Sequence, residues 1–70
     1  TSREMEILRL LSSGKSLSEI AWLVNSSYKT VANTSSIMRQ KLGVRTLVRQ
    51  VELLRARGIL EYLLLTARRR

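Results

Sequence analysis

The side chains best suited to specific polar contacts are concentrated in residues 26–44, SSYKTVANTSSIMRQKLGV. If this segment is helical, one face carries Val31, Ser35, Met38 and Leu42 and would be core. The opposite face carries small, polar and basic side chains: Lys29, Ala32, Asn33, Ser36, Arg39 and Gln40. Because this outer face contains no acid, it can approach an anionic surface without charge repulsion.

These residue types match the chemistry of base edges in the DNA major groove. Asn and Gln pair with adenine, Arg with guanine, and small apolar groups contact the thymine methyl. Asn33, Gln40, Arg39 and Ala32 supply those types. Ser27, at the start of the expected helix, and the neighbouring Lys29 favour a phosphate there, where free amides meet the positive end of the helix dipole. An ordinary amphipathic helix with a solvated polar face explains the same pattern.

The composition argues against catalysis and against a bound metal. The chain has no Cys and no His, which excludes a thiol nucleophile, a disulfide and a Cys/His metal site. Glu4 and Glu19 follow Thr1 and Ser16 by three residues, the spacing of a capping box, so we interpret them as helix caps. We therefore expect a protein that is not an enzyme and has no cofactor.

The charge is strongly basic, with 13 Lys and Arg against 5 acids and a net charge of +8. No acid occurs between Ile20 and Val51, a region that contains Lys29, Arg39, Lys41, Arg45 and Arg49. Such an excess predicts attraction to a polyanion, although a solvated basic surface is the simpler alternative. No apolar run approaches the roughly 18–20 residues of a membrane span, and we expect a cytoplasmic protein.

The elements that position these residues are expected to be four helices, over about 2–12, 17–24, 28–42 and 47–57, in an all-α domain. Ser16, Ser27 and Thr46 are the expected N-caps of the last three helices, while Gly14, Gly43 and Gly58 stand where three of the helices should end. The buried residues predicted for the other helices are Met5, Leu8, Leu11, Ile20, Ala21, Val24, Leu47, Val51 and Leu54. We assign residues 1–58 to this domain and residues 59–70, ILEYLLLTARRR, to an extension that docks on the domain or on another chain.

A short helix, a turn near residue 26 and a longer helix together form a helix-turn-helix. In that motif the second helix lies in the major groove and the first crosses the DNA backbone. Four fragments at their spacing, TSREMEIL, GKSLSEIAWLV, SYKTV and KLGV, resemble the LuxR/FixJ-type DNA-binding domain, the effector domain of NarL-like bacterial response regulators. The resemblance runs from Thr1 to about Leu54.

This resemblance implies a four-helix domain that binds double-stranded DNA sequence-specifically through its third helix, in a transcription regulator of the two-component type. It places Ala32, Asn33 and Ser36 at base contacts and Lys29 and Thr30 at phosphates. The expected base contacts are thus Ala32, Asn33, Ser36 and Gln40, and the expected phosphate contacts are Ser27, Lys29, Thr30, Arg39 and Lys41. Because the chain begins inside the first motif of the family, we expect a piece of a longer regulator.

The fourth helix of the family often mediates dimerisation, so Leu47, Leu53 and Leu54 are the candidate dimer residues. Leu53, together with Ile59, Leu60 and Leu63, could form a dimer patch or instead a core extended by the C-terminal segment. We expect a homodimer on DNA, with RNA polymerase as a further partner to consider. Trp22 is expected to lie partly buried over the surface of the domain.

Three other functions compete with DNA binding by this family. The basic helix could dock on an acidic protein such as a polymerase subunit, or the C-terminal segment ILEYLLLTARRR could lie on a membrane surface without spanning it. The promoter-binding domain of a sigma factor is also a helix-turn-helix, but the GKS and KLGV blocks argue against it.

Overall fold

The computed structural model describes residues 2–68, which form five helices joined by short turns. These are α1 (Ser2–Ser12), α2 (Leu17–Leu23), α3 (Tyr28–Leu42), α4 (Leu47–Arg57) and α5 (Ile59–Arg68). Residues 2–68 contain no strand, which confirms the all-α prediction. The first four helices have the predicted bounds, except that α2 ends one residue earlier, at Leu23.

Polar side chains cap the N-terminal ends of α2, α3 and α4, as predicted. The Ser16 Oγ accepts from the Glu19 amide at 3.1 Å, and the Glu19 Oε1 accepts from the Ser16 amide at 2.9 Å, a complete capping box. Ser27 and Thr46 begin α3 and α4 by accepting from the backbone amide three residues further on, each at 3.1 Å. These caps are confirmed, and the box predicted at Thr1 lies outside the described residues.

The turn between α2 and α3 depends on Asn25, whose φ of 56° lies in the left-handed region. The Ser26 amide donates to the Ala21 carbonyl at 2.9 Å, and the Asn25 amide donates to the Trp22 carbonyl at 3.3 Å. This pair of bonds is the Schellman motif that ends many helices, and Asn adopts its left-handed position more readily than most residues with a side chain. The turn therefore fixes the direction in which α3 leaves α2.

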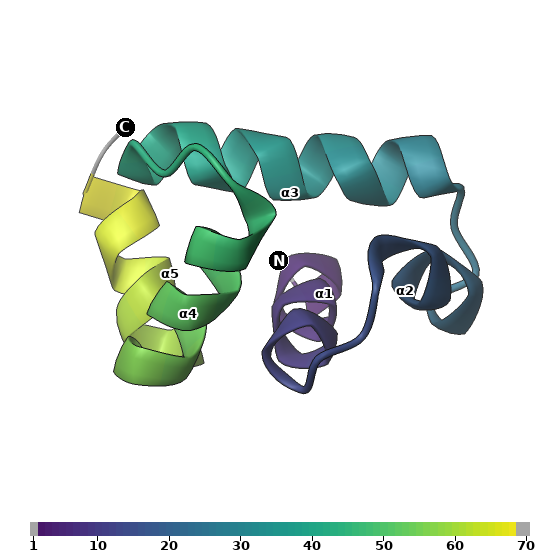
Figure 1. Cartoon of the computed structure of the whole chain (residues 1–70), viewed down its shortest axis with the longest axis horizontal. Coiled ribbons are helices and arrows are strands. Elements are labelled where there is room, and N and C mark those ends of the chain that lie inside the picture. Colours follow the sequence, from purple (N-terminus) through teal and green to yellow (C-terminus); the bar gives the residue numbers. More distant parts are fainter. Residues whose placement is uncertain (1, 69–70) are drawn as a thin grey trace.

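The helix α3 runs along the whole molecule, with α2 near its N-terminal end, α4 and α5 near its C-terminal end and α1 between them (Figure 1). The fully buried apolar side chains come from all five helices and the α2–α3 turn: Ile7, Leu8, Leu11, Ile20, Ala21, Val24, Val31, Met38, Leu54 and Tyr62. Most were predicted to be core. Four others predicted there, Met5, Leu42, Leu47 and Val51, are only partly buried.

The prediction of four helices is wrong by one, because the C-terminal segment forms α5. Gly58 separates α4 from α5, and α5 packs against α1, α3 and α4. Its Tyr62 is completely buried in the common core. Of the two alternatives for this segment, the structure shows docking on the domain. No helix within residues 2–68 has both the length and the apolar character needed to cross a membrane.

Candidate nucleic-acid interface

The outer face of α3 is accessible to solvent along its length. Asn33 and Gln40 are exposed, Ala32 and Ser36 are partly exposed, and none of the four carries an acidic group. The opposite face buries Val31, Ser35 and Met38, as the helical pattern predicted. Because α5 packs near the C-terminal end of α3 without covering these four outer residues, the face is open to a large ligand.

The N-terminal end of α3 offers donors to an anion. The Ser27 Oγ accepts from the Thr30 amide at 3.1 Å and donates to the Thr30 Oγ1 at 2.9 Å. The amides of Tyr28 and Lys29 have no acceptor within residues 2–68. Lys29 is exposed and forms no ion pair with any described residue. A phosphate at this end would meet a cation, free amides and the positive end of the helix dipole.

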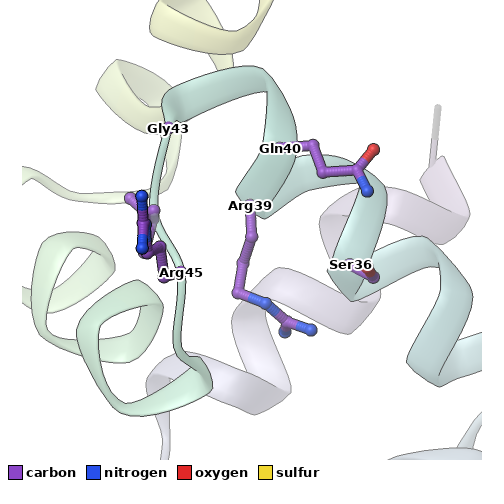
Figure 2. Close-up of a pocket in the computed structure, with 6 residues that line it drawn as sticks. Ser36, Arg39, Gln40, Gly43 and Arg45 are labelled. Atoms are coloured by element: carbon purple, nitrogen blue, oxygen red, sulfur yellow. The ribbon is translucent and has the colours of Figure 1, made fainter.

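The C-terminal end of α3 carries a hollow of about 490 Å³ lined by Ser36, Arg39, Gln40, Gly43, Val44 and Arg45. Gly43 turns the chain here with a φ of 71°, and the Val44 amide donates to the Arg39 carbonyl at 2.9 Å. The turn brings Arg45 to one side of the hollow, and Arg39 lies between Arg45 and Ser36 (Figure 2). Two cations therefore border a space large enough for a phosphate group.

Arg39 connects this hollow to a buried polar group, the Gln50 cluster, made of Ser35 and Arg39 of α3, Gln50 of α4 and Tyr62 of α5. The Gln50 Oε1 accepts from the Ser35 Oγ at 2.7 Å and from the Arg39 Nη1 at 3.1 Å. The Arg39 Nη1 also donates to the Ser35 Oγ at 2.7 Å. The Gln50 Nε2 donates to the Tyr62 hydroxyl oxygen at 2.8 Å and to the Ser35 carbonyl at 3.3 Å.

Three members of the Gln50 cluster are completely buried, and their polar side-chain atoms are paired. Ser35, Gln50 and Tyr62 each have an exposed fraction of 0%. No buried side-chain nitrogen or oxygen in the described part of the chain lacks a hydrogen-bond partner. Burial raises the pKa of the Tyr62 hydroxyl, an effect that the Gln50 hydrogen bond and the Arg39 charge oppose. The hydroxyl is therefore neutral at physiological pH, as an acceptor for an amide should be.

A family model for the luxR family of bacterial regulatory proteins matches residues 1–54, more than half of the chain. The chain belongs to this luxR family. The methanol utilization control regulatory protein MoxX of Paracoccus denitrificans is 45% identical over 47 residues, which cover 67% of this chain and 21% of that protein. The chain thus spans about a fifth of the length of this curated relative. No solved structure matches the chain.

The luxR-family domain is accordingly a helix-turn-helix DNA-binding domain of a bacterial transcription regulator, and its family is not enzymatic. The helix-turn-helix is the pair α2 and α3 with the Asn25 turn. The family match ends before α5, so the Tyr62 end of the Gln50 cluster lies beyond the matched residues.

The structure changes the interpretation of several predicted residues of the luxR-family domain. Arg39, an expected phosphate contact on the outer face, is partly buried, and its Nη1 is bonded to Ser35 and Gln50. Leu54 is 1% exposed and belongs to the core, so it presents no surface to a dimer partner. Leu47 and Leu53 are partly buried against the same core. Trp22 was expected to be partly buried and is instead 83% exposed, because it lies on the outer side of α2.

Sequence reasoning missed Gln50 and Tyr62. A signal for Gln50 was present, because Leu47, Gln50, Val51 and Leu54 follow the spacing of a buried helical stripe. A polar residue on such a stripe needs a buried partner, and Ser35 on the predicted core face of α3 was in the same situation. Nothing in the sequence indicated that these two residues face each other.

The basic region keeps most of its charge unpaired in the structure. Arg49 forms an exposed ion pair with Glu52 at 3.2 Å, the kind of surface pair that contributes little stability. Lys29, Lys41 and Arg45 form no ion pair with any of residues 2–68. Three cations near the two ends of α3 are therefore free to meet an anionic ligand.

Proposed function

We propose that α3 of this domain enters the major groove of duplex DNA, with its outer face toward the bases and both of its ends toward the phosphate backbone. The observation that carries the proposal is an exposed, acid-free helical face between two cationic ends. A major groove admits one α-helix, and a helix-turn-helix presents its second helix to that groove.

In this arrangement the two kinds of contact have different tasks. Base-edge contacts come from Ala32, Asn33, Ser36 and Gln40, and these select the sequence. Phosphate contacts come from Ser27, Lys29, Thr30, Arg39 and Lys41, and these fix the register of the helix on the duplex. Arg45, across the hollow from Arg39, adds a cation at the C-terminal end of α3.

We also propose that the whole protein is a cytoplasmic response regulator that binds DNA as a homodimer. The support for the response regulator is the resemblance to the effector domains of such proteins. The dimer is proposed because two copies of a helix-turn-helix domain on two half-sites contact twice as many bases as one copy. Leu47 and Leu53 are the remaining candidates for the dimer contact. Contact with RNA polymerase would then follow at the promoter.

The proposal is tested by fluorescence anisotropy with a labelled random-sequence duplex at increasing salt concentration. Binding through about four phosphate contacts predicts a straight line of log K against log salt with a slope of about −3 to −4. Lys29→Ala should weaken binding to every duplex and make the slope shallower by about one. No duplex binding at low salt would refute the proposal.

Arg57→Ala is the matched control, because it also removes one exposed cation. Arg57 ends α4 and pairs with Glu61 at 2.8 Å. The C-terminal end of α4 lies at the side of the molecule away from α3 (Figure 1). Its loss should leave the slope almost unchanged. An equal change of slope for Lys29→Ala and Arg57→Ala would indicate a response to net charge alone and would contradict the proposed orientation.

A further inference from the structure

The Gln50 side-chain amide has only one favourable orientation in its buried surroundings. Its oxygen faces two donors, the Arg39 Nη1 and the Ser35 Oγ, and its nitrogen faces two acceptors, the Tyr62 hydroxyl oxygen and the Ser35 carbonyl. Rotating the amide by half a turn would place N–H groups against the guanidinium and its oxygen against the Ser35 carbonyl. The Tyr62 hydroxyl can donate or accept, so the acceptor-only Ser35 carbonyl and the donor-only Arg39 guanidinium set the orientation of the amide. The Tyr62 hydrogen bond then holds the Gln50 side chain in place beside Arg39, because an unmade hydrogen bond in a buried site is costly.

This arrangement also orients the guanidinium of Arg39. Its Nη1 is held by Ser35 and Gln50, whereas its Nε and Nη2 donate to no residue within 2–68. The free edge formed by Nε and Nη2 can make two parallel hydrogen bonds to a phosphate. Arg39 lines the hollow together with Arg45, and Figure 2 shows its side chain extended between Arg45 and Ser36.

We propose that Gln50 and Tyr62 are positioning residues for DNA binding, which fix the Arg39 guanidinium in the orientation that a backbone phosphate requires. The inference rests on the proposed contact between Arg39 and DNA. It makes α5 a part of the DNA-binding apparatus, although Tyr62 is completely buried and touches no DNA itself. A long arginine side chain held in advance loses less conformational freedom when it binds, so its contact contributes more affinity.

The test is a double-mutant cycle on the full chain with Tyr62→Phe and Arg39→Ala, measured by anisotropy with a labelled random-sequence duplex. Tyr62→Phe keeps the buried ring and removes only the hydroxyl. It should weaken duplex binding about three- to tenfold, the effect of about one hydrogen bond. In the Arg39→Ala background the same substitution should change the affinity by less than about twofold, since its effect passes through Arg39.

Thr66→Val is the control, because Thr66 is a second buried hydroxyl on α5 that bonds only within its own helix, to the Leu63 carbonyl at 2.8 Å. It should leave duplex affinity unchanged. The inference is overturned if Thr66→Val weakens binding as much as Tyr62→Phe, if Tyr62→Phe binds as well as or better than the parent, or if its effect persists without Arg39. Circular dichroism verifies that each variant is folded.

Gln50→Leu supplies a second test if Tyr62→Phe does not fold. It removes the amide oxygen that accepts from the Arg39 Nη1, so duplex binding should weaken in the parent chain and change by less than about twofold in the Arg39→Ala background. An equal loss of affinity in both backgrounds would overturn the inference. If Arg39→Ala alters neither the duplex affinity nor the salt slope, the positioning role of Gln50 and Tyr62 is refuted. The Lys29→Ala result then decides separately whether α3 binds DNA.

Discussion

Asn33 and Lys29 lie one turn apart on α3, yet they should affect DNA binding in different ways. Asn33 is exposed at the middle of the outer face, and its amide can pair with adenine through two hydrogen bonds. We expect Asn33→Ala to cost about 1–3 kcal/mol on a preferred duplex and little on random DNA. Selection from a random duplex library supplies the preferred site, and competition binding supplies the two affinities.

The neighbouring Thr34 provides the control for this substitution. Its Oγ1 donates to the Thr30 carbonyl within α3 at 2.9 Å, so Thr34→Ala removes a side chain of similar size without removing an adenine partner. Its effect on both duplexes should be small. Equal losses on preferred and random DNA after Asn33→Ala would show that Asn33 only positions the helix.

For single residues, the sequence predicted which chemical groups the outer face carries better than it predicted the direction in which each side chain points. The type and spacing of Asn33 and Lys29 placed both on the outer face, because a helix repeats its faces regularly. Arg39 was placed there too, but its side chain is long enough to turn inward, and the buried Gln50 draws its Nη1 to the core. The exposed Trp22 was misjudged because apolar character alone does not determine burial.

The end of α3 depends on the backbone conformation of Gly43, which connects α3 to the loop bearing Arg45. A Cβ at Gly43 would meet nothing within 4 Å, so Gly43→Ala strains the left-handed backbone without a steric clash. We expect a loss of about 1 kcal/mol in the free energy of unfolding, measured by urea denaturation. Gly43→Asn should cost less, because Asn adopts this conformation more readily. Equal costs for Ala and Asn would point to a cause other than backbone strain.

The bounds of the first four helices were predictable because the signals that set them are local. Ser27 caps α3 through an amide three residues away, and Gly43 ends it through its own φ. No comparable signal marks α5, since the single residue Gly58 both ends α4 and precedes α5. The apolar residues after Gly58 required burial, but only the packed structure shows that Tyr62 reaches Gln50.

At the scale of the whole molecule, α5 covers a part of the core that α1 to α4 leave uncovered. Tyr62 is the largest fully buried side chain, and its hydroxyl satisfies one N–H of the buried Gln50. Without α5, a buried amide and part of the apolar core would be exposed to water. A domain of this size has little stability to spare, so the loss should be evident in unfolding experiments.

We therefore expect a chain ending at residue 58 to melt at least about 15 °C below the full chain, since truncating one buried aromatic side chain typically costs about 3–5 kcal/mol. Thermal unfolding followed by circular dichroism measures the difference. Leu60→Ser is the control, because Leu60 is on α5 but 73% exposed, and its substitution should change stability by no more than about 0.5 kcal/mol. If the shortened chain melts at the temperature of the full chain, Tyr62 adds nothing to the fold. Residues 1–58 would then fold without help from α5.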